Sequence, residues 1–364
     1  MRDVGRSVIL VDRGNWRRGF YPSAGAELAC RIGARGWSIL NASAGRGRIP
    51  FLLGALAAIL RRRNEYAVAS ISVFSGPAFV WAEASAALLR GLGKPHIAVL
   101  RGGNLPDFAR RWPDRVRRLL SSATVVVAPS RYLRESMRPY RSDIRLLPNA
   151  IDLPLYPFRF RSKAAPRLVW LRAFHVIYNP SLALGVLAEL AYEHPESTLI
   201  MVGPDKGDGS LQDFERKVRA LDLEGRVELA GSVPKEQVPT WLDRGDIFIN
   251  TTNIDNTPVS VIEAMACGLC VVSTNVGGIP YLLEHEVDAL LVPPNDSKAM
   301  AGAVRRVLTE PGLAERLSRN ARRKVEGFDW QVVLPQWEAL FDDMLDPDGY
   351  SRGVRGRRHD DIPS

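Results

Sequence analysis

The chain has 364 residues, of which 46% are hydrophobic and 24% charged, and its net charge is +9. This length exceeds what one hydrophobic core usually serves, so two domains are expected, and the composition excludes a disordered or fibrous protein. The longest apolar run, residues 49–60, is shorter than the roughly 20 residues that a membrane span needs. The first residues show no signal-peptide pattern, and three cysteines are too few for a disulfide framework. We therefore expect a cytoplasmic location.

The charge is divided unequally along the chain. Residues 1–150 hold 25 Lys and Arg against 9 Asp and Glu, a net charge of +16, so the rest of the chain carries −7. This asymmetry indicates an anionic partner for the first half, such as nucleic acid, an anionic membrane surface or a phosphate-bearing acceptor. Solvated faces of an arginine-rich protein are the plainer explanation. The arginines lack the interleaved aromatic residues or recognition helix of a nucleic-acid binder, so we expect no nucleic acid.

Short β-branched runs alternate with amphipathic stretches through the first half. Strands are expected at residues 7–11, 38–42, 68–73, 97–100, 123–128 and 144–147. The helical stretches between them, such as 23–36 and 77–93, end in glycine, as helices often do. This alternation predicts a parallel sheet with helices on both faces.

A segment with four prolines, residues 148–166, interrupts the alternation, which then restarts. Six further strands are expected at residues 167–171, 197–203, 226–231, 246–251, 269–274 and 288–294. The predicted fold class is therefore α/β, with two Rossmann-like, doubly wound parallel-sheet domains that face a central cleft. The expected parts are a first domain (1–150), a hinge linker (151–166), a second domain (167–328), a C-terminal helix that packs back on the first domain (329–345) and a disordered tail (346–364).

Residues 253–280, NIDNTPVSVIEAMACGLCVVSTNVGGIP, hold the most informative pattern. A strand exit loop leads into a short helix that Thr257 is expected to cap, with Pro258 in its first position and Gly268 at its end. Ligands of doubly wound sheets bind beyond the carboxyl ends of the strands, often against a helix start. The unpaired N–H groups of the first turn, together with the helix dipole, predict an anion site there.

Two carboxylates flank this predicted anion site. Asp255 lies in the loop and Glu263 lies one and a half turns into the helix. A carboxylate suits adjacent sugar hydroxyls because it accepts two hydrogen bonds at once. The predicted ligand carries phosphate flanked by polyols, as a nucleotide sugar does.

Residues 255–280 resemble the donor-binding signature of the group 1, family-four retaining glycosyltransferases, which have the GT-B fold. That signature has an acid, seven residues, Glu, then Ala-Met-Ala-x-Gly-x-Pro-Val-Val and a Gly-Gly loop. The segments PNAID (148–152), LIMVGPD (199–205) and DALLVPPND (288–296) agree with it. The resemblance is strong over residues 120–345 and extends to the first domain by architecture. It implies retaining transfer of a hexose-type sugar from a nucleotide diphosphate sugar to a glycan or lipid-linked acceptor of a surface polysaccharide or glycolipid, without a metal or other cofactor.

The resemblance also implies roles for individual residues. Glu263 would hold the nucleotide ribose, Asp255 the hydroxyls of the donor sugar, and Arg172 the diphosphate; these three are the catalytic candidates. The other candidates for donor binding are Gly203, near the strand end that the nucleotide approaches, Val233 near the base, Asn256, Thr257, Pro258 and Val259 at the helix start, and His175 and Lys206. The candidates for the acceptor side of the cleft are Gly25, Arg101, Gly102, Gly103 and Asn104.

Departures from the family pattern keep other functions open. The family often has a lysine about six residues after the arginine, where YNP (178–180) stands here, so Lys206 or a first-domain residue would have to substitute. The glycine-rich loop, residues 20–27, has one central glycine, and LRGGN (100–104) replaces a loop that frequently carries histidine; His96 precedes that strand. A non-catalytic nucleotide-sugar binding protein and a nucleotide-sugar epimerase are the alternatives. No G-x-G-x-x-G opens a helix, which argues against an NAD-linked dehydrogenase.

Three further patterns have a structural and a functional interpretation. Cys267 and Cys270 have C-x-x-C spacing, but no second pair completes a zinc site, so packing is expected. Gly277-Gly278 is a turn or a backbone contact with the donor. The segment 49–63 pairs an apolar face with three arginines and is either a buried helix or a helix that rests on anionic lipid, with support from the arginine-rich segment 108–123.

Overall fold

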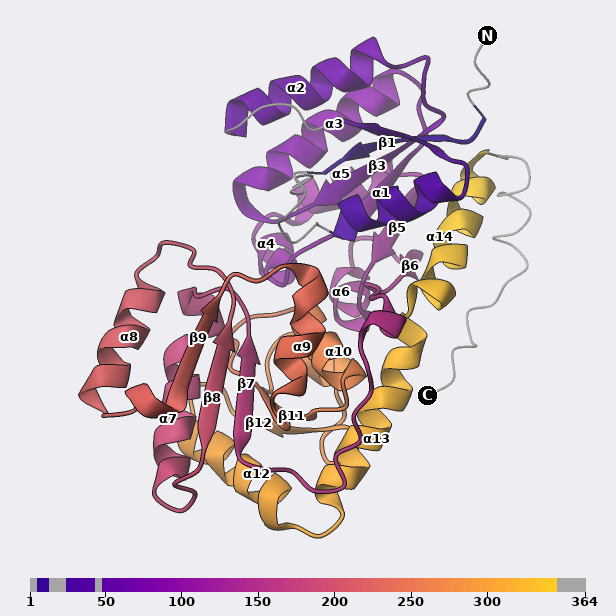
Figure 1. The fold of residues 1–364 in the computed structure, drawn as a ribbon. Helices are drawn as coiled ribbons and strands as arrows, with labels where there is room; N and C mark the ends of the chain where they lie inside the picture. Colours follow the sequence, from indigo (N-terminus) through magenta and orange to yellow (C-terminus); the bar gives the residue numbers. More distant parts are fainter. Residues whose placement is uncertain (1–4, 13–23, 43–47, 346–364) are drawn as a thin grey trace.

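The computed structural model describes residues 5–12, 24–42 and 48–345, apart from the side chain of Arg48. The predicted tail (346–364) and the first part of the glycine-rich loop (20–23 of residues 20–27) lie outside the described residues. The described chain forms two parallel six-stranded sheets, each covered by helices (Figure 1). None of the described helices has the length and apolar content that a bilayer crossing requires.

The first sheet has the strand order β2-β1-β3-β4-β5-β6 and the second has the order β12-β11-β10-β7-β8-β9. Their strands are β1 (Ser7–Val11), β2 (Ser38–Asn41), β3 (Val68–Val73), β4 (His96–Leu100), β5 (Val125–Ala128), β6 (Ile144–Leu146), β7 (Arg167–Leu171), β8 (Thr198–Val202), β9 (Val227–Gly231), β10 (Ile247–Asn250), β11 (Cys270–Thr274) and β12 (Ala289–Val292). All twelve predicted strands are confirmed, with ends that differ by at most two residues. Most of these strands are buried on both faces, whereas the edge strands β2 and β9 are partly exposed.

Helices α1 and α14 cover one face of the first sheet, and α2 to α6 cover the other. Their bounds are α1 (Ala24–Ala34), α2 (Arg48–Arg61), α3 (Phe79–Gly91), α4 (Leu105–Arg111), α5 (Pro113–Ser122), α6 (Arg131–Met137) and α14 (Trp330–Leu345). Helix α14 follows the second domain in sequence, yet its Trp330, Trp337 and Phe341 pack against Val8 and Leu10 of β1. The chain therefore ends its described part on the first domain (Figure 1).

The second sheet is likewise covered on both faces. Helices α7, α8 and α12 share one hydrophobic cluster with it, and α9, α10 and α11 share the other, while α13 contributes to both. Their bounds are α7 (Pro180–Ala191), α8 (Ser210–Ala220), α9 (Val238–Asp243), α10 (Val259–Ala266), α11 (Ile279–Leu282), α12 (Ser297–Thr309) and α13 (Leu313–Val325). The second cluster also contains Ile151, Leu153 and Tyr156, so the linker is part of the core of the second domain.

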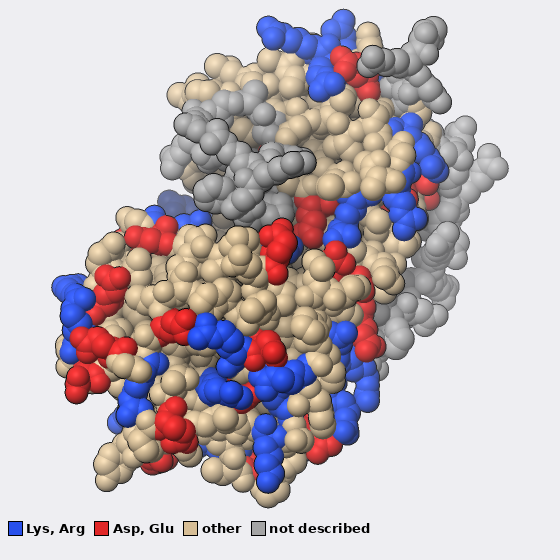
Figure 2. Space-filling model, viewed as in Figure 1, with Lys and Arg blue, Asp and Glu red and all other residues tan. Residues whose placement is uncertain are grey.

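The two domains differ in their surface charge. On the face shown in Figure 2, acidic and basic side chains are mixed over the second domain. Where grey atoms do not cover the first domain, that face shows mainly uncharged surface, with Lys and Arg at the top, where α2 ends in Figure 1, and also along the right side. Arg61, Arg62 and Arg63 belong to this end of α2 and the turn after it.

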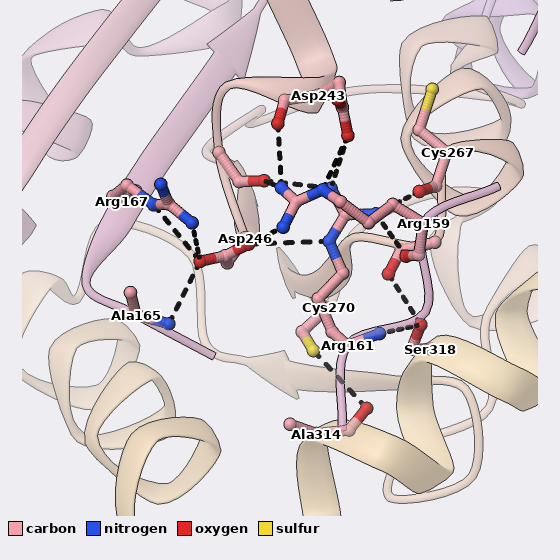
Figure 3. Close-up of polar contacts among 12 residues, drawn as sticks. Arg159, Arg161, Ala165, Arg167, Asp243, Asp246, Cys267, Cys270, Ala314 and Ser318 are labelled. Atoms are coloured by element: carbon pink, nitrogen blue, oxygen red, sulfur yellow. Dashed lines mark hydrogen bonds and ion pairs between the residues drawn. The ribbon is translucent and has the colours of Figure 1, made fainter. Parts of the chain in front are cut away.

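The linker is fastened to the second domain by a cluster of arginines and aspartates (Figure 3). Arg161 is 1% exposed, and its guanidinium donates to the carbonyls of Arg159, Cys267 and Gly245. Asp246 pairs with Arg159 at 2.9 Å and with Arg167 at 2.8 Å. Because these groups precede β7 and β10, the cluster closes the amino-terminal edge of the second sheet.

Candidate functional site

A cleft of about 370 Å³ lies between the two domains. It is lined from the first domain by Ser75, Arg101, Gly102, Gly103, Asn104, Pro129 and Asn149, and from the second by Ile177, Tyr178, Ile254, Asp255, Asn256 and Thr257. These residues follow β3, β4, β5 and β6 in one sheet and β7 and β10 in the other. The carboxyl ends of both parallel sheets therefore meet at one cavity, which is where ligands of such sheets bind.

The loop between β10 and α10 is held in shape by hydrogen bonds. The Thr251 hydroxyl donates to the Tyr178 carbonyl at 2.7 Å, and the Asn253 N–H donates to the Ile177 carbonyl at 2.7 Å. The Asp255 side chain accepts from the N–H of Asn256 at 2.8 Å. The side chains that this loop presents to the cleft are thus preorganised by the neighbouring loop after β7.

Glycines allow two other loops to approach this one closely. The Gly278 N–H donates to the Asp255 carbonyl at 3.0 Å, and a Cβ on Gly277 or Gly278 would overlap the backbone of Asp255 or Asn256. Gly103 of the first domain lies so close that its Cβ would be 2.9 Å from the Asp255 carbonyl carbon. The described contacts of the glycine pair are therefore with the 255–256 backbone, and Gly103 brings the first domain against the same loop.

Helix α10 begins one residue later than predicted. Pro258 is its N-cap and Val259 its first residue, and no side chain caps it, so the predicted cap at Thr257 and first position at Pro258 are wrong. The ring of Pro258 is compatible with the extended backbone of an N-cap residue. Thr257 therefore precedes the N-cap and lies outside the helix. The hydroxyls of Thr257 and Ser260 are buried and have no hydrogen-bond partner within the described chain. The start of α10 thus combines free first-turn N–H groups with two unpaired hydroxyls.

Arg172, which follows β7, forms an ion pair with Asp255, which follows β10. The guanidinium also lies over the ring of Tyr178, 4.6 Å from its centre. Burial lowers the pKa of Arg172, and no described residue accepts a hydrogen bond from its Nε–H. Gly203, with φ of +145°, lets the end of β8 touch the Arg172 carbonyl, which a Cβ would block. The cation is thus fixed at the cleft with hydrogen-bonding capacity left over.

Glu263 lies deeper on α10 and is 3% exposed. Its Oε1 accepts a hydrogen bond of 2.6 Å from the hydroxyl of Tyr156 in the linker. Burial raises the pKa of Glu263, while the Tyr156 hydrogen bond and the charges of Lys235 and Arg172 oppose that rise and Glu27 adds to it. A buried carboxylate is costly unless its oxygens are satisfied. Glu263 is therefore unusual for a residue in a hydrophobic cluster.

The first domain contributes a second arginine to the cleft. Arg101 donates to the Asn149 side chain at 3.1 Å, and burial lowers its pKa. Gly102 has φ of +86°, which favours glycine and turns the loop after β4 so that Gly103 and Asn104 also reach the cleft. The predicted residues 101–104 are thus brought together with 255–257 by the tertiary structure.

Nine of the predicted site residues are not part of the cleft lining. Five of these are described above: Arg172, Gly203, Pro258, Val259 and Glu263. The other four are Gly25, Val233, Lys206 and His175. Gly25 is in the first turn of α1, against the Asp12 side chain, and Val233 is buried in the second-domain core. Lys206 is exposed in the loop after β8. His175 caps a short 3-10 helix, Val176–Tyr178, where its Nδ1 accepts from the Ile177 N–H at 3.1 Å. Their predicted roles stay predictions.

The two domains contact each other on both sides of the cleft. The Ser130 hydroxyl of the first domain donates to Asn256. On the other side, Lys235 pairs with Glu27 of α1 at 2.8 Å, and Glu27 also accepts from the indole N–H of Trp330 at 3.0 Å. Glu27 therefore connects the second domain, α1 and α14.

Three residues of the site were not identified from the sequence. Tyr178 occupies the place where the resemblance implies a lysine, so that departure was the available signal. Ser260 lies in the recognised segment, and its neighbour Thr257 was singled out instead. Tyr156 had no sequence signal, because its partner Glu263 is 107 residues away.

Cys267 and Cys270 are buried free thiols, and burial raises the pKa of each to about 12, as expected for packing residues. Within the described ranges, no three His, Cys, Asp or Glu side chains are close enough to hold a metal ion.

Comparison with known proteins divides the chain in the same way as the structure. The family described as "Glycosyl transferases group 1" matches residues 166–324, and "Glycosyltransferase Family 4" matches residues 10–154. Among curated relatives, glycogen synthase of Mycobacterium tuberculosis is 28% identical over 204 residues, covering 55% of this chain and 49% of the relative. The putative colanic acid biosynthesis glycosyltransferase WcaL of Escherichia coli is 38% identical over 140 residues, covering 35% and 34%. The chain spans about half the length of the first curated relatives it matches.

Solved structures share the architecture. Sucrose-phosphate synthase of Thermosynechococcus elongatus superimposes with a TM-score of 0.79 at 19% identity, covering 92% of this chain and 98% of the other. Anabaena HepE in complex with UDP and glucose gives a TM-score of 0.72 at 16% identity, covering 92% and 99%. The GT-B fold that the resemblance implied is therefore confirmed.

Proposed function

Because this chain belongs to the group 1, family-four glycosyltransferases, we propose that it transfers a hexose-type sugar from a nucleotide diphosphate sugar, with retention of configuration, to a glycan or lipid-linked acceptor in polysaccharide or glycolipid synthesis. The observation that carries the proposal is the start of α10, where two unpaired hydroxyls and the first-turn N–H groups follow the loop whose Asp255 pairs with the buried Arg172. Structural neighbours in complex with UDP and with UDP-glucose support a donor of this class.

The diphosphate of the donor would bind at the first turn of α10. The N–H groups there, including that of Val259, and the hydroxyls of Thr257 and Ser260 donate to phosphate oxygens. Arg172 adds a full positive charge that the planar guanidinium directs at two oxygens. Arg101 lines the same cleft, and it supplies a second cation, in place of the absent lysine, more readily than the exposed Lys206.

The two carboxylates would hold the sugars on either side of the diphosphate. Glu263 accepts hydrogen bonds from the ribose, and Asp255 accepts them from the transferred sugar. The ion pair between Asp255 and Arg172 adds a second task, because Asp255 then orients the cation as well. His175 and Asn256 are the remaining polar candidates around the sugar.

The chemical step would break the bond between the anomeric carbon and the diphosphate oxygen and form a bond from that carbon to the acceptor hydroxyl on the same face. The acceptor proton moves to the departing phosphate oxygen. Negative charge builds on the diphosphate during this step, so the donors at α10 and Arg172 stabilise the transition state more than the ground state. The first-domain residues Arg101 to Asn104 lie opposite and would orient the acceptor.

A thermal-shift panel of UDP-, GDP- and ADP-sugars tests the donor class, since a ligand that binds the folded state raises its stability. Sugar transfer and nucleoside diphosphate release are then measured with and without acceptors, and with EDTA, which should leave the rate unchanged. Nucleotide binding with no turnover would favour a non-catalytic binding protein. Conversion of the donor without acceptor would favour an epimerase.

The same proposal places the first domain on the inner face of the cytoplasmic membrane. Helix α2 buries Phe51, Ala55 and Ile59, as predicted for a core helix. Its other face exposes Ile49 by 71% and Leu53 by 61%. The buried-helix interpretation thus describes one face of the segment, and the exposed face is the one that the proposed lipid contact would use.

Basic residues are exposed on the same domain as this apolar stripe, and an interfacial helix on anionic lipid would use them. Arg61 and Arg63 are exposed at its end, and Arg117 and Arg118 are exposed on α5 of the same domain. Flotation with phosphatidylserine vesicles at low salt should recover the protein, and changing Ile49 and Leu53 together to Ser should reduce recovery. Leu221→Ser, at a residue 49% exposed on the second domain, is the matched control. No binding by the unaltered chain would exclude the membrane role.

A further inference from the structure

The linker between the domains runs along the carboxyl-terminal half of α10. The Arg322 guanidinium donates hydrogen bonds to the Tyr156 carbonyl at 3.2 Å and to the Ala266 carbonyl at 2.7 Å. The Arg159 N–H donates to the Cys267 carbonyl at 3.2 Å. Tyr156 itself is 2% exposed and belongs to the same hydrophobic cluster as α10. The position of Tyr156 relative to α10 is therefore fixed through its backbone and its ring.

The hydroxyl of this fixed Tyr156 ring is hydrogen-bonded to the Glu263 carboxylate. The Tyr156 O–H donates to Oε1 at 2.6 Å, and Oε2 accepts no hydrogen bond from the part of the chain that the structure describes. A hydrogen bond to a charged oxygen is short and directional, so it holds the rotation of the carboxylate. The second oxygen retains its full capacity to accept.

A purely structural role explains this pair poorly. Burying a carboxylate and a phenol in an apolar cluster costs more than packing two apolar residues. The surrounding charges do not neutralise the carboxylate by contact, since Lys235 pairs with Glu27 and Arg172 pairs with Asp255. The geometry suits a carboxylate that is held by one oxygen and used by the other.

We propose that Tyr156 is a positioning residue for donor recognition: its hydroxyl fixes Glu263 so that Oε2 faces the ribose hydroxyls of the nucleotide. This inference rests on the proposed function, in which Glu263 binds the ribose. The linker that joins the two domains thereby determines how strongly the second domain distinguishes a ribonucleotide from a deoxynucleotide.

The test compares the dissociation constants of UDP, GDP and ADP with those of their 2′,3′-dideoxy counterparts by calorimetry on the full chain. The ratio of the two constants for the nucleotide that binds best reports the contact with the ribose hydroxyls. Tyr156→Phe removes one oriented hydrogen bond and should reduce this ratio by about fivefold. A structural effect would instead weaken both ligands equally and leave the ratio unchanged.

Tyr66→Phe is the matched control. Tyr66 is fully buried, and its hydroxyl donates to the Ile59 carbonyl at 3.1 Å in the first domain, outside the residues that line the cleft. Tyr66→Phe should lower the thermal stability about as much as Tyr156→Phe does, and it should keep the wild-type ratio of dissociation constants. In a Glu263→Ala background, Tyr156→Phe should not change the ratio further, as expected for residues that act as one unit.

The outcomes separate this inference from the proposed function. If the wild type binds a nucleotide and prefers ribose, but Tyr156→Phe keeps the full preference, the positioning role is wrong and the donor site stands. A wild type with no ribose preference also overturns it. If none of the three nucleotides binds the wild type, the proposed function fails first. If Tyr156→Phe does not fold, Glu263→Gln replaces it as the test. This variant keeps an acceptor for the Tyr156 hydroxyl but loses the charge, so it should reduce the ratio of dissociation constants. An unchanged ratio contradicts the inference.

Discussion

Two arginine–aspartate clusters lie at opposite ends of the neighbouring strands β7 and β10. Arg161, Arg167 and Asp246 are at the amino-terminal ends, and Arg172 and Asp255 are at the carboxyl ends. Both clusters are largely withdrawn from solvent, and both consist of the same two residue types. They differ in how fully their hydrogen-bonding groups are used.

At the amino-terminal end, Arg161 donates to three backbone carbonyls and pairs with two aspartates (Figure 3). At the carboxyl end, the described partners of Arg172 are one carboxylate and one aromatic ring. The carboxylates differ as well. Burial raises the pKa of Asp246, but hydrogen bonds from Arg167 and Ala165 outweigh it and lower the pKa overall, whereas burial dominates at Glu263 and raises its pKa. Arg161 Nε and Asp246 Oδ1 have ion-pair partners but no hydrogen bond among the described residues, so the amino-terminal cluster is not fully satisfied either. It nevertheless has more partners than the carboxyl-end cluster, and the cluster with fewer partners is the one suited to a ligand.

The largest expected effect is on stability at the amino-terminal cluster. Arg161→Ala removes a buried cation that pairs with Asp246 and donates to three carbonyls, of which Gly245 and Cys267 keep a hydrogen bond from Arg159, and it should lower the free energy of unfolding by about 3–5 kcal/mol. Arg172→Ala should cost less, because the described partners of Arg172 are one carboxylate and one aromatic ring. Urea unfolding followed by circular dichroism measures both. Equal losses would erase the distinction between the clusters.

The second effect is on activity. Here a substitution at Arg172 should have a larger effect than a substitution at an arginine of the amino-terminal cluster. Arg172→Ala removes a donor that acts where charge develops, so the rate of sugar transfer should fall by about 10²- to 10³-fold. Glu263→Ala should weaken donor binding as well as the rate. Arg167→Ala, at the exposed rim of the other cluster, is the control and should keep the wild-type rate. Wild-type transfer by both Arg172→Ala and Glu263→Ala, with the fold intact, would refute the assigned site.

A third, smaller effect separates the tasks of Asp255. Asp255→Asn removes the charge that is paired with Arg172 and leaves that cation available to phosphate. The dissociation constant of the nucleoside diphosphate should then fall by up to about tenfold, which corresponds to roughly 1.4 kcal/mol, while sugar transfer decreases. Calorimetry with UDP, GDP and ADP measures the first change. Weaker binding of the diphosphate would show that Asp255 supports Arg172 more than it competes for it.

The smallest effect concerns pH. Because the folded-state pKa of Glu263 is raised, protonation removes its negative charge at a higher pH than for an ordinary Glu, so binding should weaken as the pH falls through that raised pKa. The stability term has the opposite sign, since a raised carboxylate pKa destabilises the fold increasingly as the pH rises through the interval between the unfolded and folded values. Glu263→Gln should remove this part of the pH dependence of binding and leave the part due to phosphate. An identical profile for wild type and variant would contradict the shift.

Much of the architecture was predictable because it depends on local patterns. The β-branched runs marked all twelve strands, and their alternation with helical stretches predicted two parallel sheets. The segment 253–280 predicted a loop, a helix start and two carboxylates, and the family matches over both domains agree with the resemblance it carried. The start of helix α10 was predicted one residue too early. A proline fits both the N-cap and the first turn of a helix, and the neighbouring contacts decide between these two positions.

The amino-acid sequence by itself determined the elements and the residue types at the carboxyl ends of the strands, because hydrophobic periodicity and helix-end chemistry act over a few residues. The tertiary structure decided which groups meet. It paired Arg172 with Asp255, set Gly103 against the same loop, placed Val233 in the core, and brought Tyr156 to Glu263 across 107 positions of sequence. Such contacts depend on how two sheets and a linker pack in space, and that packing arises from many weak interactions summed over distant segments rather than from any single stretch of the chain.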